Sequence, residues 1–235
     1  MTLDPSYVLA LAGILFGALA QASTGMGFSL VSAPVLVLHL GPREGVATAV
    51  ALAVVSSVVP LLRDGRHARA GDVTRLLVPT LLCTYPIAWA LRGADTRLLA
   101  LAAGAGVIAA VCALAAGVRW SWLRRPEGAV ATGATSALLN VVGGVGGPPI
   151  GLYAANAGWE PATMRGNLHA FFLVQNAATA LVLGVVIPDL TQLAALALGT
   201  ACGMFLAPRM PLKTLRTAVL GASLLGGIGL VAGAV

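Results

Sequence analysis

Charged residues are scarce in this chain. Only 9% of its 235 residues are Asp, Glu, Lys or Arg, whereas 58% are hydrophobic. A water-soluble protein of this length could not bury so much apolar surface, so the composition predicts an all-α integral membrane protein surrounded by a lipid bilayer. The eight acidic residues fall in predicted loops or at the ends of apolar stretches. This placement argues against a cation site built from carboxylates inside the membrane.

Cysteine and the usual catalytic signatures are also scarce. Cys83, Cys112 and Cys202 each stand alone in an apolar stretch, so neither a disulfide framework nor a zinc site is predicted. The sequence contains no His-Glu-x-x-His motif, no Gly-x-Ser-x-Gly motif and no phosphate-binding loop for ATP hydrolysis. We therefore expect no enzymatic activity, no cofactor and no metal ion.

Two short hydrophobic segments are each interrupted by a glycine cluster, at residues 21–28 and 140–149. In membrane proteins, paired interrupted helices are the best sequence indication of a transport site, because the freed backbone groups need water or a ligand. A shift of 119 positions superposes the two clusters, with Gln21 on Asn140, Gly25 on Gly144 and Gly27 on Gly146. The sequence therefore predicts an internal repeat.

The apolar stretches divide into two halves of five segments each, residues 1–118 and 119–235. The helices expected in the first half cover residues 7–20, 28–40, 45–62, 73–91 and 98–117. Those expected in the second half cover residues 128–139, 150–157, 164–187, 190–206 and 215–234. The first two segments of each half are too short to cross the membrane, and we expect them to form broken or re-entrant helices.

The basic residues predict the orientation of the two halves. The loops near residues 63–75, 119–125 and 209–216, together with Arg165, fall on one side of the membrane and carry all basic residues except Arg43, Arg92 and Arg97. The positive-inside rule makes that side cytoplasmic and places both termini outside. These basic loops favour contact with lipid headgroups over nucleic acid. Because the basic stretch 63–72 falls on residues 182–191, whose only charge is Asp189, we expect the halves to be inverted.

Uncharged polar side chains at the interruptions, together with Gln175 and Asn176 near the middle of their predicted span, are the candidate ligands of a solute. Hydrogen bonding between packed helices is the alternative role for such side chains. His169 is the one group at depth that could carry a coupling proton, and helix packing is its alternative role. The candidate substrate-binding residues are Gln21, Ser23, Thr24, Gly25, Gly27, Asn140, Gly144, Gly146, Gly147, Gln175 and Asn176.

The interruptions favour an anion as the solute. Half-helices starting near Phe28 and Pro149 would point their free N–H groups and positive dipole ends toward the membrane centre. Glycines allow an anion to approach the backbone, and Val at Gly25 or Gly146 is expected to abolish binding. Neutral donors alone would bind a small oxyanion weakly and reversibly, as a carrier requires.

At this stage the chain resembles the sulfite exporter TauE/SafE family of bacterial membrane proteins. The resemblance rests on Gly25-Met26-Gly27-Phe28 with Pro34, and on the stretch 144–149, which reads Gly-Val-Gly-Gly-Pro-Pro. It covers essentially the whole chain. The family implies transport of sulfur-containing anions such as sulfite, sulfoacetate or another organosulfonate across the bacterial inner membrane. The first interruption departs from the pattern, because Ser23 and Thr24 replace glycines.

These observations predict a secondary transporter that moves a small sulfur-containing anion by alternating access. An anion channel and a membrane subunit of a larger complex remain alternatives. The sequence is compatible with a homo-oligomer and does not identify the anion or the direction of transport.

Overall fold

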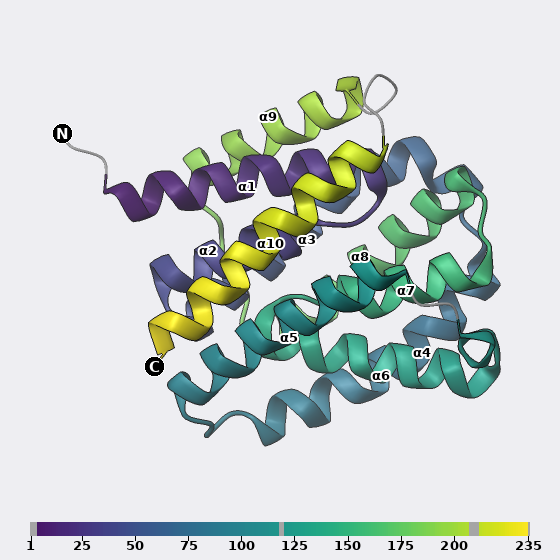
Figure 1. Cartoon of the computed structure of the whole chain (residues 1–235), viewed down its shortest axis with the longest axis horizontal. Helices are drawn as coiled ribbons and strands as arrows, with labels where there is room; N and C mark the ends of the chain where they lie inside the picture. Colours follow the sequence, from purple (N-terminus) through teal and green to yellow (C-terminus); the bar gives the residue numbers. More distant parts are fainter. Residues whose placement is uncertain (1–3, 118–119, 207–211, 235) are drawn as a thin grey trace.

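Over the residues that the structure describes, the protein is a bundle of ten α-helices with two short 3-10 turns (Figure 1). The computed structural model describes residues 4–117, 120–206 and 212–234. The helices of the first half are α1 (Pro5–Thr24), α2 (Phe28–Leu40), α3 (Pro42–Asp64), α4 (Ala70–Ala90) and α5 (Thr96–Ala116). Those of the second half are α6 (Pro126–Gly143), α7 (Gly147–Ala157), α8 (Pro161–Leu183), α9 (Leu190–Leu206) and α10 (Leu212–Ala234). The turns are η1 (Gly65–His67) and η2 (Ser121–Arg124).

The two interruptions are shorter than the sequence predicts. Helix α1 continues through the polar residues after Ala20, because the hydroxyls of Ser23 and Thr24 donate to the carbonyls of Leu19 and Ala20 in their own helix. It ends at Gly25, whose φ of 86° favours glycine. Helix α6 likewise continues to residue 143. The breaks are therefore residues 25–27 and 144–146.

The longer α1 corrects a second expectation. Its 20 residues give a length of about 30 Å, enough to span a membrane, whereas the sequence predicts a segment too short to cross. Among the described residues, five helices are long and apolar enough to span: α1, α3 (with η1), α4, α5 and α8. Helices α2 and α7 have 13 and 11 residues and remain short, as predicted.

Each interrupted pair forms a hairpin of helices. Near the start of α1, Ser6 Oγ lies 2.7 Å from His39 Nδ1 in the last turn of α2. In the second pair, the amide of Trp120, just before η2 and α6, donates to Asn156 Oδ1 near the end of α7 over 2.8 Å. The chain therefore returns to the same end of the bundle after each break.

Helices α3 and α8 pack against each other along their length, and the outer helices pair as α1 with α9, α4 with α6 and α5 with α10 (Figure 1). Small residues allow close approach. A Cβ added at Gly203 in α9 would lie 2.5 Å from the carbonyl oxygen of Leu19 in α1. A Cβ added at Gly104 in α5 would lie 2.9 Å from the carbonyl oxygen of Gly227 in α10. Such contacts between small residues are typical of helices packed in lipid.

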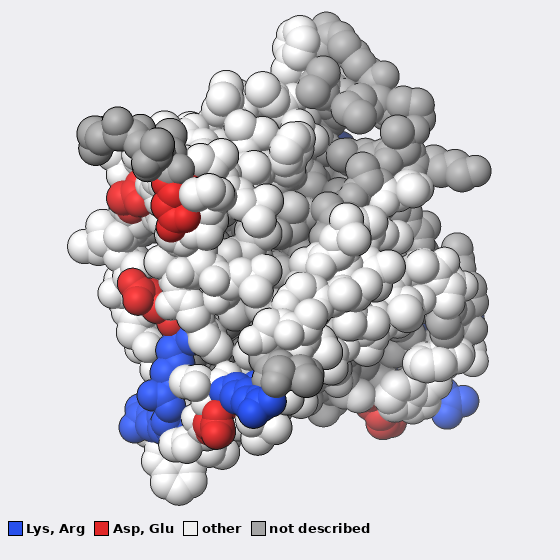
Figure 2. Space-filling model, turned by 60° about the vertical axis from the view of Figure 1, so that its left-hand side comes forward, with Lys and Arg blue, Asp and Glu red and all other residues white. Residues whose placement is uncertain are grey.

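The molecular surface is mainly uncharged, and charged side chains lie toward the margins of the face shown in Figure 2. Large apolar side chains are exposed, including Leu62 near the end of α3 (82%), Ile187 in the segment before α9 (89%) and Leu190 at the start of α9 (83%). Exposed apolar surface of this extent requires lipid around it. The chain is therefore a multi-pass membrane protein.

Candidate functional site

The two breaks meet at one small pocket in the bundle. Six of the predicted site residues line it: Gln21, Gly27, Asn140, Gly146, Gly147 and Asn176. Its volume is about 10 Å³, close to the space that a single water molecule needs. Segments 119 residues apart in the sequence thus converge on a common polar centre.

On the α1 side, a buried amide fixes the wall of the pocket. Gln21 is 4% exposed, and its Nε2 donates to Ser56 Oγ over 3.0 Å and to Ser57 Oγ over 2.9 Å. Both hydroxyls donate onward to the carbonyl of Ala53 in their own helix. The donors of Gln21 are therefore used to join α1 to α3.

On the α6 side, Asn140 has the corresponding position. Its Nδ2 donates to Asn176 Oδ1 over 3.1 Å and to Thr179 Oγ1 over 2.9 Å, which joins α6 to α8. Its Oδ1 accepts from the amide of Gly146 in the break over 3.2 Å. Because Oδ1 of Asn176 is engaged, its Nδ2 is the side-chain donor that this wall offers to a ligand.

Two half-helices begin at the pocket. Helix α2 starts after Gly27 and helix α7 after Gly146, and at neither N-terminus does the side chain of the capping residue accept a hydrogen bond from the first amides. The first amides of a helix have no partner within that helix, and the helix dipole makes this end positive. The amide of Gly146 donates to Asn140, and the two prolines after Gly147 have no N–H, so the backbone donors that the pocket offers to a small anion are those of Gly147 and of the first turn of α2.

The other five predicted site residues lie outside the pocket lining. Ser23 donates to the carbonyl of Gly203, and Thr24 donates to the carbonyl of Met26 within the break. Gly25 and Gly144 both have positive φ and pack against Leu168 and Ala33, respectively. Gln175 donates through Nε2 to Ser136 Oγ over 2.8 Å. In the structure these residues shape the breaks that position the pocket.

Three further residues line the pocket that sequence reasoning did not select: Ser29, Leu30 and Phe172. Ser29 and Leu30 belong to the first turn of α2, so the predicted start of that helix could have indicated them. Phe172 precedes Asn176 by four residues, which places both on one face of α8. An apolar aromatic residue gives no sequence signal of a polar site.

His169 lies between this pocket and the end of α8 that contains Arg165. Its side chain is fully buried, and neither ring nitrogen has a hydrogen-bond partner among the described residues. Arg165, His169, Phe172 and Asn176 follow one another at helical spacing, so they share one face of α8. No group of three His, Cys, Asp or Glu side chains suited to a metal ion occurs within residues 4–117, 120–206 and 212–234.

The comparison with protein families agrees with this architecture. The family model of the sulfite exporter TauE/SafE family matches residues 9–230, nearly the whole chain. Comparisons with curated proteins and with solved structures gave no match. The family comprises membrane transporters for sulfite and related sulfur anions rather than enzymes. With its interrupted hairpins and its match over residues 9–230, this chain belongs to the sulfite exporter TauE/SafE family.

Proposed function

We propose that this protein is a secondary carrier that moves sulfite or a small organosulfonate such as sulfoacetate by alternating access. The observation that carries the proposal is the convergence of both breaks on one pocket, with Gln21 and Gly27 on one side and Asn140, Gly146 and Asn176 on the other. In carriers with interrupted helices the solute binds at such a meeting point.

The chemistry of the pocket favours an anion that is bound weakly. The donors are the amides in the first turn of α2, the amide of Gly147 at the start of α7 and the Nδ2 of Asn176, all of them neutral. A buried Arg or Lys would hold an oxyanion more tightly, and tight binding would slow release. Partial dipole charges attract the anion and still allow it to leave.

The size of the pocket favours a carrier over a channel. A volume of about 10 Å³ admits one water and no oxyanion. The helices around the pocket must therefore separate when the anion enters. Coupling between entry and helix movement is the defining property of alternating access, whereas a channel needs a continuous wet path.

Matching contacts in the two halves support an inverted repeat of residues 1–118 and 119–235. Under the 119-residue shift, the bond from Gln21 to Ser57 has its counterpart in the bond from Asn140 to Asn176. The packing of α1 on α9 has its counterpart in the packing of α6 on α4. Each half thus completes the other, and we place the pseudo-two-fold axis in the membrane plane.

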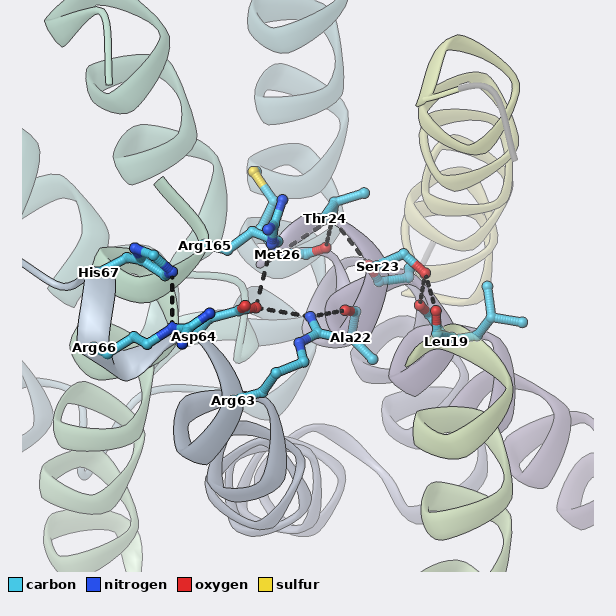
Figure 3. Close-up of polar contacts among 12 residues, drawn as sticks. Leu19, Ala22, Ser23, Thr24, Met26, Arg63, Asp64, Arg66, His67 and Arg165 are labelled. Atoms are coloured by element: carbon cyan, nitrogen blue, oxygen red, sulfur yellow. Dashed lines mark hydrogen bonds and ion pairs between the residues drawn. The ribbon is translucent and has the colours of Figure 1, made fainter. Parts of the chain in front are cut away.

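We further propose that the protein lies in the bacterial inner membrane with both termini outside. The start of α1 and the end of α10 lie at the same end of the bundle in Figure 1. Arg63, Arg66 and Arg165 gather at the opposite end, around η1 and the start of α8 (Figure 3). Arg69 follows directly after η1, and basic residues favour the cytoplasm. Arg119 and Arg209, which belong to the predicted cytoplasmic set, lie outside the described residues.

Uptake into proteoliposomes tests the proposed function. Radiolabelled sulfite should accumulate saturably, and excess unlabelled sulfite inside the vesicles should accelerate its entry, which distinguishes a carrier from a channel. Competition by sulfate, thiosulfate, sulfoacetate and taurine would identify the preferred anion. Absence of uptake by folded purified protein would contradict an independent carrier and favour a subunit of a larger complex.

A matched pair of variants tests the location of the site. Asn176→Asp places a negative charge in the pocket wall and keeps an oxygen that can accept from Asn140, so sulfite binding should fall at least about tenfold. Asn156→Asp adds the same charge outside the pocket, in the last turn of α7, and should leave binding near the wild-type level. Equal effects of both variants would remove the site from this pocket.

A further inference from the structure

A buried carboxylate joins the end of α3 to the start of α8. Asp64 is 5% exposed, and its Oδ2 lies 2.7 Å from Arg63 Nη2 and 3.2 Å from Arg165 Nε (Figure 3). Each arginine side chain is about one-third exposed, at 32% and 31%. One buried acceptor thus holds two cations at the edge of the bundle.

The same cluster is fastened to α1 just before the first break. Arg63 Nη2 also donates to the carbonyl oxygen of Ala22 over 3.2 Å (Figure 3). The four residues Ala22, Arg63, Asp64 and Arg165 therefore connect three helices on the side where α3 ends. We call them the ion-paired cluster.

The repeat gives each member of the ion-paired cluster a counterpart in the other half. The 119-residue shift relates Ala22 to Val141, Arg63 to Val182, Asp64 to Leu183 and Arg165 to Val46. All four counterparts line a single cavity of about 220 Å³. The exposed residues Arg43 and Arg92 also line this cavity, at the opposite end of α3.

The glycine beside the ion-paired cluster is packed more tightly than the glycine beside its apolar counterpart. A Cβ added at Gly25 would lie 3.2 Å from the Cα of Arg165, so the backbone of the first break lies close to the backbone of α8. At the related position, a Cβ added at Gly144 would approach Val46 no closer than its terminal Cγ1, at 3.8 Å. Packing is therefore tight at the ion-paired cluster and looser at the apolar counterpart.

We infer that the ion-paired cluster and its apolar counterpart are the two gates of the carrier. Ion pairs close the gate at Asp64, while the gate formed by Val46, Val141, Val182 and Leu183 stands open to the Arg43 end. In the opposite state, the apolar residues pack together and the arginines leave Asp64 for water. This inference rests on the proposed alternating access and on the repeat, and it adds which residues form each gate.

Two cysteine probes at repeat-related positions report the gates separately. Val142 lines the 220 Å³ cavity and is half-buried, whereas its counterpart Ser23 is 5% exposed and bonded to the carbonyl of Gly203. After Cys83, Cys112 and Cys202 are replaced by Ala, Val142→Cys in nanodiscs should react readily with a small charged methanethiosulfonate. Ser23→Cys should react slowly in the same preparation.

Asp64→Asn then tests the ion-paired gate. Loss of the charge that holds two arginines should raise the labelling rate of Ser23→Cys about tenfold, the change expected when a two-state equilibrium loses a charge-assisted hydrogen bond, and should lower that of Val142→Cys. Asp72→Asn is the matched control, because Asp72 lies in the first turn of α4, outside the cluster. It should leave both rates unchanged.

Arg63→Gln is a second variant that guards against misfolding by Asp64→Asn. It retains the pair between Arg165 and Asp64 and should shift both rates in the same directions by a smaller factor. Unchanged rates in either variant, with wild-type elution and thermal unfolding, would overturn the inference.

The labelling needs no substrate, so the proposed gates and the proposed function can be contradicted independently of each other. Reciprocal changes in labelling without sulfite transport would uphold the gates and contradict sulfite as the solute. Sulfite transport without reciprocal changes would uphold the carrier and overturn these gates.

Discussion

Asn140 holds the second break in shape by accepting a hydrogen bond at Oδ1 from the amide of Gly146, over 3.2 Å. The two residues lie in the same pocket wall, and Gly146 is also held through its carbonyl, which accepts from Ser136 Oγ over 2.7 Å. The break is therefore a fixed structure, in which the side chains of Asn140 and Ser136 take the place of the hydrogen-bond partners that a continuous helix would supply to Gly146.

Removal of the Asn140 amide should destabilise the protein. Asn140→Ala leaves the buried amide of Gly146 without its acceptor, which costs about 1–3 kcal/mol of unfolding free energy. Thr179→Val, which removes only one acceptor of Asn140 Nδ2, should cost less. Thermal unfolding in one detergent compares the two variants, and an equal or larger loss for Thr179→Val would contradict this role of Asn140.

The adjacent glycines of the second break should respond differently to alanine. A Cβ added at Gly147 would lie 3.7 Å from Phe172 Cζ, an ordinary contact, while it narrows the pocket. Gly147→Ala should therefore fold normally and bind sulfite more weakly. A Cβ at Gly146 would lie 2.7 Å from Gln175 Nε2, so Gly146→Ala should lose about 1–3 kcal/mol of stability through overpacking.

Thermal unfolding and sulfite-induced thermal shifts separate these two effects. Wild-type affinity in Gly147→Ala would show that the anion does not occupy this pocket. The comparison also changes how a loss of binding in Gly146→Val or Gly25→Val should be interpreted. A Cβ at either position meets neighbouring protein atoms, so those variants test folding before they test binding.

His169 is the group we expect to couple transport to protons. It is fully buried on α8 between the ion-paired cluster and the pocket, with Asp64, Arg63 and Arg165 as the charges that act on it. His169→Ala should make sulfite uptake independent of a pH gradient across proteoliposomes. His67→Ala, in the exposed turn η1, is the matched control. Wild-type pH dependence in His169→Ala would leave helix packing as the role of this histidine.

Two glycine substitutions, one at the contact between α1 and α9 and one on an open part of α10, should have opposite effects on stability. Gly203→Ala forces its Cβ against the carbonyl of Leu19 and should destabilise the protein. A Cβ at Gly221 in α10 meets nothing within 4 Å, so Gly221→Ala should stabilise by up to about 1 kcal/mol through helix propensity. Unfolding in detergent measures both, and a stable Gly203→Ala protein would contradict the close approach of these helices.

Much of this fold could be predicted from the sequence because prolines and glycines mark the helix ends. Pro5, Pro42, Pro126 and Pro161 each stand in the first turn of a helix, where proline loses no hydrogen bond. The ends of α1 and α6 were placed too early. Polar residues such as Gln21 indicate an interruption, but their side chains bond within or between helices, and the helix continues to the first glycine with positive φ.

The candidate site was predictable only in part. Amides at the breaks indicated Gln21 and Asn140, and an amide in the middle of a predicted span indicated Asn176, whereas the participation of Phe172 depends on how α8 is rotated toward the breaks. Asp64 was expected in a loop or at a span edge. Its burial depends on Arg165, 101 residues away in the chain, and spacing alone could not show that contact.

The partial exposure of Arg63 and Arg165 has a consequence for the living cell. Dissolved salt screens charges that water can reach and leaves packed valines almost untouched. With the gates and orientation proposed above, a rise in cytoplasmic ionic strength would therefore weaken the ion-paired gate modestly, because Asp64 itself is buried, and would spare the apolar gate. Under the same proposal, the direction in which the resting carrier faces would depend in part on the salt concentration of the cytosol.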